Sequence, residues 1–137
     1  MTRPTDEHTI DLLRRVPYFA DLSLDELAVV ATRLVARRLK PGQVAFLEGE
    51  SSAGLHLVVT GLDKIYRHSP EGREQVLALL RPGDSCNEVP VVDGGPNPAS
   101  GAAVEETVFW IWPGEEMDRL RRELPRLNEA IISGLAA

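Results

Sequence analysis

The sequence is poor in cysteine, in long apolar runs and in positive charge, and each shortage excludes a class of protein. The single cysteine, Cys86, cannot form an intrachain disulfide or supply a four-cysteine metal or iron–sulfur site. No apolar run approaches the roughly 18–20 residues that cross a membrane. The polar segment over residues 1–8 lacks the apolar core of a signal peptide. We therefore expect a cytoplasmic protein that does not enter a membrane.

The charge balance argues against direct binding of nucleic acid. The formal net charge is −6 over 137 residues, and nonspecific affinity for DNA or RNA requires a surplus of Lys and Arg. Hydrophobic residues make up 43% of the chain and charged residues 26%, which is typical of a folded domain. A chain of this length has room for one domain with its own core, so we expect residues 1–137 to form a single domain.

Three patterns follow one another along the chain: helical spacing, then short β-rich runs, then helical spacing again. They predict an N-terminal helical part over about residues 10–40, a β-rich part over 41–112 and two C-terminal helices over 113–137. No C-terminal capping signal follows the last apolar residues, so the final helix is expected to be cut short.

The helical parts carry recognisable start signals. Ser23 and Glu26 have the spacing of a capping box, and the apolar residues after them predict a helix over residues 24–35. Near the C-terminus, the spacing predicts a short helix over 115–123 and a second one opened by Pro125.

The middle part has the pattern of an antiparallel β structure. Strand-like runs end in clusters of Gly, Pro, Asn, Asp and Ser. The main runs cover residues 44–47, 55–59, 64–67, 74–80 and 107–112. No helix-length segment separates them, so parallel βαβ units are excluded. An antiparallel sandwich or jelly roll is predicted, and the aromatic residues of the last run are expected in its core and against the helices.

The turns between these runs occur in a specific order: Pro41-Gly42, Gly49-Glu50, Gly61 and Pro82-Gly83. In this order and spacing, the chain resembles the cyclic nucleotide-binding domain of Crp/Fnr-type bacterial transcription regulators over about residues 16–135. The resemblance implies a mainly β fold, an antiparallel β-roll (a jelly roll, or double-stranded β-helix) with an N-terminal helix and two C-terminal helices. It also implies an effector-sensing and dimerisation domain rather than an enzyme.

In the family, a phosphate-binding cassette follows the last of these turns. Its pattern is phenylalanine, glycine, glutamate and leucine, then about ten residues later an arginine and a small residue. The resemblance assigns the ribose hydroxyl to the glutamate, and the cyclic phosphate to the arginine and to backbone N–H groups of a short helix. The matching ligand-binding positions are Asn87, Glu88, Val89, Pro98, Ala99 and Ser100.

This chain departs from the family pattern at the phosphate. Glu88 matches the glutamate, but Pro98 stands at the arginine position and Asn87 at the glycine. Residues 82–106 contain five acids and no Lys or Arg, so a bound phosphodiester would face uncompensated negative charge. Loss of one charged hydrogen bond weakens binding by about 1.5–3 kcal/mol, or one to two decades. The sequence therefore predicts a sensor domain that does not bind cAMP in the usual way.

Two alternatives remain open. The chain could bind cAMP or cGMP through a relocated arginine such as Arg67, Arg73 or Arg119, or it could be a ligand-free dimerisation and interaction module. A basic side chain pointing into the roll would favour the first alternative, and a pocket filled by its own side chains the second. The effector is otherwise unknown. Haem bound near Cys86 is possible, although a buried structural thiol is the favoured interpretation because the neighbouring acids oppose a thiolate.

Several of these residues also have purely structural interpretations. Glu88 is either a ligand contact or a first-turn acid after an Asn87 helix cap. The loop over residues 94–100 is either a reshaped effector pocket or a rigid surface turn. His56 alternates with the apolar Leu55, which predicts a solvated face for it. The histidines are scattered, so no metal site and no enzyme are predicted.

The last helix is the candidate dimer interface. Leu127, Ile131 and Leu135 lie on neighbouring helical rows, and the resemblance implies a homodimer through this helix. In the family the helix continues into a helix-turn-helix. That DNA reader is absent from this chain, so contact with DNA would need a further segment. The predicted partners are a second copy of the chain and a small-molecule effector.

Overall fold

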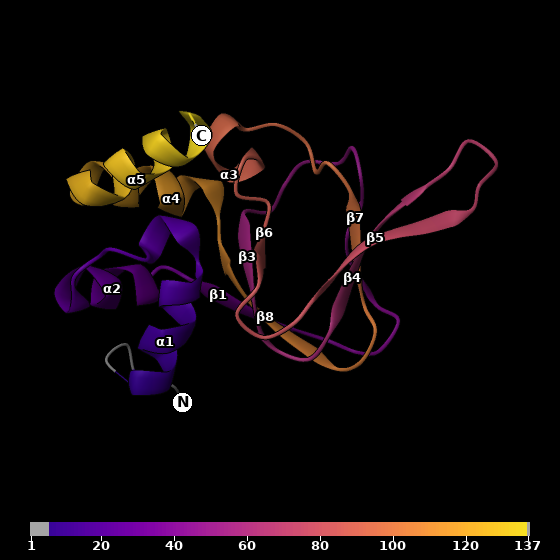
Figure 1. Ribbon diagram of the computed structural model, residues 1–137, viewed down its shortest axis with the longest axis horizontal. Coiled ribbons are helices and arrows are strands. Elements are labelled where there is room, and N and C mark those ends of the chain that lie inside the picture. The colour runs from indigo at the N-terminus through magenta and orange to yellow at the C-terminus, as the bar shows by residue number, and fades with distance from the viewer. Residues whose placement is uncertain (1–5, 137) are drawn as a thin grey trace.

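The computed structural model describes residues 6–136, in which two facing β-sheets lie beside a layer of helices (Figure 1). The helical elements are α1 (Glu7–Arg15), the 3-10 turn η1 (Pro17–Phe19), α2 (Leu24–Ala31), α3 (Pro90–Asp93), α4 (Gly114–Glu123) and α5 (Pro125–Ala136). The strands are β1 (Val35–Leu39), β2 (Val44–Phe46), β3 (Leu55–Thr60), β4 (Asp63–His68), β5 (Glu74–Leu80), β6 (Ser85–Cys86), β7 (Ser100–Ala103) and β8 (Thr107–Trp112).

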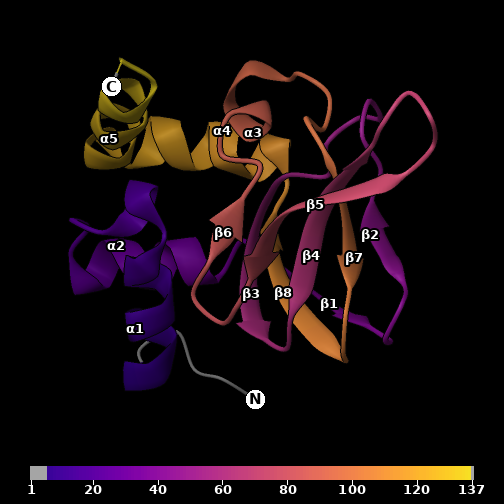
Figure 2. The same ribbon diagram turned by 45° about the vertical axis from the view of Figure 1, so that its right-hand side comes forward.

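Each sheet has four strands, and every pairing between them is antiparallel. One sheet has the order β1-β8-β3-β6 and the other β2-β7-β4-β5. Figure 2 shows the helical layer against the first sheet, with α3 at the end of the roll. The β4–β5 hairpin projects beyond the roll (Figure 1). The predicted mainly β fold, with helices before and after the roll, is confirmed.

The predicted start signals of the helices are confirmed. The Ser23 hydroxyl accepts the Glu26 N–H at 3.1 Å, and the Glu26 carboxylate accepts the Ser23 N–H at 2.8 Å. Pro125 is the first residue of α5, where its missing N–H would have had no helical partner. None of the described helices is both long and apolar enough to cross a membrane.

The predicted end of the first long helix is wrong. We expected a helix over residues 24–35, but α2 ends at Ala31 and the chain enters β1 at Val35. The Thr32 hydroxyl donates to the Val29 carbonyl at 2.6 Å, and β1 then pairs with β8 along its whole length. Tertiary pairing with β8 therefore overrides the local helical spacing.

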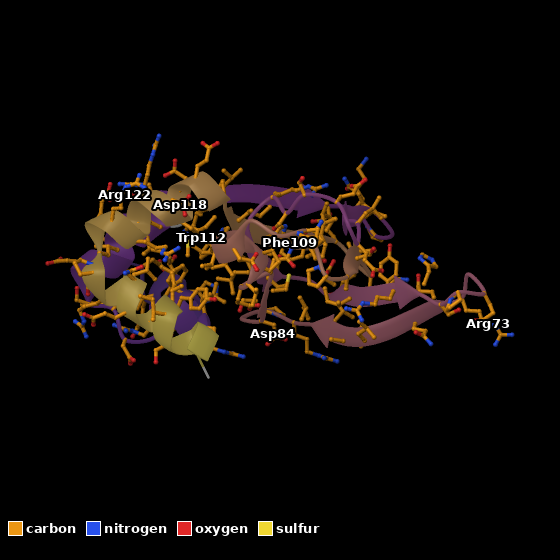
Figure 3. All side chains as sticks on the ribbon, turned by 90° about the horizontal axis from the view of Figure 1, so that it is seen from above. Arg73, Asp84, Phe109, Trp112, Asp118 and Arg122 are labelled. Atoms are coloured by element: carbon orange, nitrogen blue, oxygen red, sulfur yellow. The ribbon has the colours of Figure 1, made fainter. Side chains whose placement is uncertain are left out.

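The molecule has two apolar cores, one on each face of the β1-β8-β3-β6 sheet. Alternate residues of β8 enter different cores: Trp110 and Trp112 face the helices, and Phe109 and Ile111 face the roll interior (Figure 3). The Trp112 ring packs edge-on against the Phe19 ring, with 5.1 Å between the ring centroids. The expected core role of these aromatic residues is confirmed.

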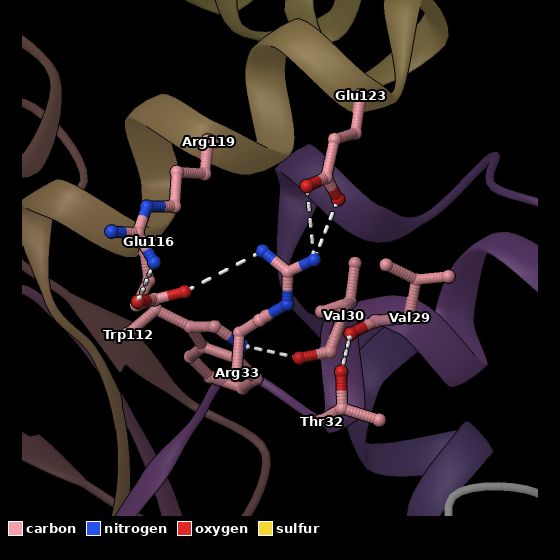
Figure 4. A network of polar contacts seen from close by, with 8 residues as sticks. All are labelled: Val29, Val30, Thr32, Arg33, Trp112, Glu116, Arg119 and Glu123. Carbon is pink, nitrogen blue, oxygen red and sulfur yellow. Dashed lines mark hydrogen bonds and ion pairs between the residues drawn. The ribbon is translucent and has the colours of Figure 1, made fainter.

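Polar contacts tie the helical layer to the roll (Figure 4). The Trp112 indole N–H donates to the Val30 carbonyl at 2.9 Å. Just after α2, the Arg33 guanidinium holds Glu123 at 2.7 and 3.0 Å and reaches Glu116 at 3.5 Å. These bonds fix α4 against the end of α2.

Candidate effector site

The matched cassette lies between β6 and β7 and begins at Asn87. This residue has φ +64°, the only positive φ of a non-glycine residue in the described part of the chain. Asparagine tolerates this left-handed conformation better than most residues. The backbone geometry therefore explains how Asn87 can replace the glycine that the resemblance implies.

The Asn87 side chain joins the two ends of the cassette. It donates to the Asn97 carboxamide oxygen at 3.3 Å, and Asn97 in turn donates to the Leu47 carbonyl at 2.9 Å. Both asparagines are buried. The predicted helix cap is wrong, since Val89 occupies the N-cap of α3 and no side chain caps that helix. Asn87 instead closes a polar bridge across the loop.

Glu88 is held on both its side chain and its backbone. Its carboxylate accepts the Ser85 hydroxyl at 2.6 Å, and its carbonyl accepts the Tyr18 hydroxyl at 2.9 Å. Glu88 precedes the N-cap Val89, so the interpretation as a first-turn acid of α3 is wrong. Its role as a ligand contact stays a prediction.

The far end of the cassette is where the arginine would lie in the family pattern. Pro98 is exposed there, whereas Ala99 and Ser100 are buried and the Ser100 hydroxyl accepts the Glu48 N–H at 2.9 Å. Val89, at the near end, is half exposed. A proline ring offers no N–H donor to an anion, so this position makes no phosphate contact of the family kind.

One of the three candidate replacement arginines lies at this position. The Arg67 Nε donates to the Pro98 carbonyl at 3.0 Å and lies 3.7 Å from the Glu48 carboxylate. Arg73 lies far away at the tip of the β4–β5 hairpin (Figure 3), and Arg119 pairs with Glu116 on α4. Sequence alone could not select Arg67, because the pairing of β4 with β7 is what brings it to the matched cassette.

His56 does not lie on a solvated face as predicted. It is 1% exposed and faces the roll interior. The centroid of its ring lies 5.0 Å from that of Phe46 and 5.2 Å from that of Phe109. Its Nδ1–H donates to the Gly54 carbonyl at 2.9 Å, and Nε2 is buried without a partner. Burial lowers the pKa of His56 to about 4. The alternation along β3 was correct, but both faces of this sheet are covered.

Asp63 is a second polar group inside the roll, and sequence reasoning missed it. It is fully buried, and neither carboxyl oxygen has a partner among the described residues. Burial raises the pKa of Asp63 to about 7. The available signal was a charged residue that opens a strand directly after the Gly61 turn.

Cys86 lies opposite His56 on the neighbouring strand β6. Burial raises the pKa of its thiol well above the usual value, and the carboxylates of Glu88 and Asp63 add to this effect. The thiol is therefore protonated near neutral pH, which favours the structural interpretation. Within residues 6–136, no three His, Cys, Asp or Glu side chains are placed to hold a metal ion.

The predicted dimer residues are largely used within the chain. Leu127 and Ile131 are fully buried in the helical core. The side chain of Leu135 lies outside the described residues. Among the described side chains of α5, the large exposed apolar one is Ile132, at 55%. Helical spacing alone cannot distinguish a core row from a subunit interface, and the dimer through this helix stays a prediction.

This roll, cassette and helical layer define the class of the protein. Residues 36–123 match the cyclic nucleotide-binding domain model, and the chain belongs to that family.

Its relatives include bacterial regulators. The chain is 31% identical to the cyclic AMP receptor protein of Thermus thermophilus and 25% identical to the CRP-like cAMP-activated global transcriptional regulator of Mycobacterium tuberculosis. These alignments cover 88% and 92% of this chain but 56% of each relative, so the chain spans about half their length.

One solved structure with this fold is a chain of similar length. The crystal structure of the N-terminal domain of a transcriptional regulator from Streptomyces coelicolor superposes with a TM-score of 0.85 at 30% identity. The match covers 92% of this chain and 88% of that one. The fold and family predicted from the turn spacing are thus confirmed.

Proposed function

We propose that this chain is the effector-sensing domain of a Crp/Fnr-type transcription regulator, and that it does not take cAMP through the family's phosphate contact. The observation that carries the proposal is Pro98, an exposed proline at the arginine position. Residues 82–106 supply no Lys or Arg to replace it from within the cassette. We infer further that the domain acts in the cytoplasm as a dimer and that contact with DNA needs a helix-turn-helix that these 137 residues do not contain.

Charge supports this proposal. The cassette region carries the carboxylates of Asp84, Glu88 and Asp93, and a cyclic phosphate would add another negative charge beside them. An arginine contact to phosphate is charge-assisted and often bidentate. Without it, about 1.5–3 kcal/mol is lost per hydrogen bond, which weakens binding by one to several decades.

The Asn87–Asn97 bridge supports it as well. A side chain now occupies the position where glycine leaves room for the phosphate, and its donor group is already used by Asn97 at 3.3 Å. The rings of Phe46, His56 and Phe109 also contact one another inside the roll. The bridge and these packed rings therefore offer a cyclic phosphate no charged partner.

A repaired cassette tests the proposal. We expect no heat when the purified wild-type chain is titrated with cAMP or cGMP to millimolar concentration. The variant Asn87→Gly with Pro98→Arg should bind cAMP at least tenfold more tightly than the matched control Asn87→Gly with Pro98→Ala. Circular dichroism would show that each variant is folded. Micromolar binding by the wild type, or equal affinities of the repaired variant and its control, would contradict the proposal.

A second candidate is a functional cAMP or cGMP domain whose phosphate partner is Arg67. Its support is the 3.0 Å contact from the Arg67 Nε to the Pro98 carbonyl, which puts a guanidinium at the cassette. The side chain is 49% exposed, so its other nitrogens are free to reach a ligand. In that case the wild type binds cAMP, Arg67→Ala loses most of the affinity, and Arg73→Ala at the hairpin tip does not. Equal affinity of both variants would exclude Arg67.

A further inference from the structure

Asp63 occupies a closed position inside the roll. It opens β4 and lies between Ala103 of β7 and Leu80 of β5 in the sheet register. A Cβ placed on Gly101 would lie 3.1 Å from the Asp63 Oδ2 and 2.7 Å from the Phe46 ring. The missing side chain at Gly101 therefore lets β7 and Phe46 close over the carboxyl group.

No counter-charge accompanies this carboxyl group. Among the described residues, the titratable groups that face the same interior are His56 on β3 and Cys86 on β6. Arg37 on β1 acts on His56 rather than on Asp63, and its guanidinium donates to the Ala45 carbonyl at 2.7 Å and the Val44 carbonyl at 3.4 Å. Glu88 adds a further negative charge next to Cys86.

The other strands around Asp63 contribute no charge. The residues that β2, β5, β7 and β8 turn towards this interior are apolar ones such as Phe46, Leu80, Ala103 and Phe109. A buried, unpaired carboxylate is strongly unfavourable, so the closed arrangement is compatible only with the neutral acid.

We propose that Asp63 is a proton-controlled latch of the β-roll: the protonated acid allows β4, β7 and Phe46 to pack closed, and loss of the proton opens this side of the roll to water. The latch acts at neutral pH because burial raises the pKa of Asp63 to about 7. It requires no effector, so it stands independently of the function proposed above.

Strand β7 connects the proposed latch to the cassette. Gly101 follows Ser100, whose hydroxyl accepts the Glu48 N–H at 2.9 Å, and Ser100 ends the matched phosphate-binding segment. Loosening β7 at Gly101 therefore moves the strand that leaves the cassette. Protonation of Asp63 would in this way set how open the candidate effector site is.

Amide hydrogen exchange of the folded chain tests the latch. Opening constants for amides of β4 and β7 are measured at pH 6 and pH 8, corrected for intrinsic exchange, in the wild type and in Asp63→Asn. Asp63→Asn cannot ionise at this position. The ratio of the wild-type opening constant to that of Asp63→Asn should therefore rise about tenfold between pH 6 and pH 8. Effects of other titrating groups cancel in this ratio. The exposed Glu106→Gln serves as the matched control, and its ratio should stay flat.

Two results would overturn the latch. One is a flat wild-type to Asp63→Asn ratio. The other is an opening free energy of the β4 and β7 amides equal to the global free energy of unfolding, since this would indicate general destabilisation rather than local opening. If Asp63→Asn does not fold, the carboxyl ¹³C resonance of Asp63 in the wild type decides. A titration midpoint near 7 supports the latch, and a midpoint near 4 overturns it.

Discussion

The two cores on either side of the β1-β8-β3-β6 sheet differ in the ionisable groups that they bury. The helical core contains large apolar side chains, and the indole N–H of Trp112 donates to the Val30 carbonyl. One buried hydroxyl on that side, Thr9, lacks a partner. The roll core instead buries an imidazole, His56, and a carboxyl, Asp63, each with unpartnered polar atoms.

This difference indicates which of the two cores serves stability and which could serve a site or a switch. An apolar core whose buried polar groups are hydrogen-bonded, Thr9 apart, holds the chain together at little polar cost. Buried ionisable groups without partners are unfavourable, and proteins retain them mainly where a site or a switch needs them. The helical core is accordingly the structural half of the molecule, and the roll core is the half in which we propose the latch.

The largest expected effect is on the helical core. Trp112→Ala removes a fully buried ring and one donor to the Val30 carbonyl, which keeps the Arg33 N–H at 3.2 Å. We expect the free energy of unfolding in urea to fall by about 3–5 kcal/mol. Ile132→Ala, at a 55% exposed site on α5, is the control and should change it by less than about 0.5 kcal/mol. A loss below about 1.5 kcal/mol for Trp112→Ala would contradict the structural role of the helical core.

The next effect is the pH dependence of the roll core, where the two buried groups act in opposite directions. The pKa of Asp63 is raised from 3.8 to about 7, so its folded form binds the extra proton and stability falls as pH rises from 4 to 7. The pKa of His56 is lowered from 6.5 to about 4, so stability falls as pH drops from 6.5 to 4. In the wild type these contributions largely cancel.

Single variants should expose each contribution. Relative to the wild type, Asp63→Asn should gain roughly 3–4 kcal/mol between pH 4 and pH 7, since about 1.4 kcal/mol accompanies each pKa unit. His56→Gln should gain roughly 3 kcal/mol relative to the wild type as pH falls from 6.5 to 4. Urea unfolding at several pH values measures both. Curves parallel to the wild type would show that neither group is buried in the folded state.

A smaller effect is expected where the helical layer meets the cassette. The Tyr18 hydroxyl donates to the Glu88 carbonyl at 2.9 Å across 70 residues of chain. Tyr18→Phe keeps the ring and removes this bond, which should lower the free energy of unfolding by about 1 kcal/mol. Because the bond holds Glu88, its amide resonance should also shift in NMR spectra. An unchanged stability and an unchanged Glu88 amide would show that the bond does not form in solution.

The smallest effect on stability is expected at the edge strand β5. Leu77 is 52% exposed there, beside the similarly exposed Val76. Leu77→Ser should change the free energy of unfolding by less than about 0.5 kcal/mol. It should nevertheless reduce self-association at high protein concentration, as seen by light scattering, because exposed apolar edge strands promote association. A stability loss above 1 kcal/mol would mean that β5 is packed rather than free.

Much of the fold could be predicted from the sequence because its signals are local. The capping box at Ser23, the start of α5 at Pro125 and the glycine turns each depend on neighbouring residues. The strand β1 was missed because only its pairing with β8 makes it a strand. The strand β7 was missed because its Ser-Gly-Ala-Ala sequence has little β-propensity of its own.

The site was less predictable, for the same reason. The missing arginine at Pro98 and the replaced glycine at Asn87 could be seen in the sequence. The contact of Arg67 with Pro98, the Asn87–Asn97 bridge and the burial of Asp63 could not, since each joins distant segments through the sheet. Sequence patterns therefore predicted the cassette positions, and the structure was needed to show what surrounds them.

The most direct test of the central claim is a titration of the ¹⁵N-labelled wild-type chain with cAMP at pH 7, followed by NMR. The resonances to follow are the backbone amides of Asn87, Val89 and Ser100, which lie in the matched cassette. If the cassette has lost the phosphate contact, these amides stay in place up to millimolar cAMP, while the spectrum shows a folded protein. Saturable shifts at micromolar cAMP would contradict the claim and make Arg67 the residue to replace first.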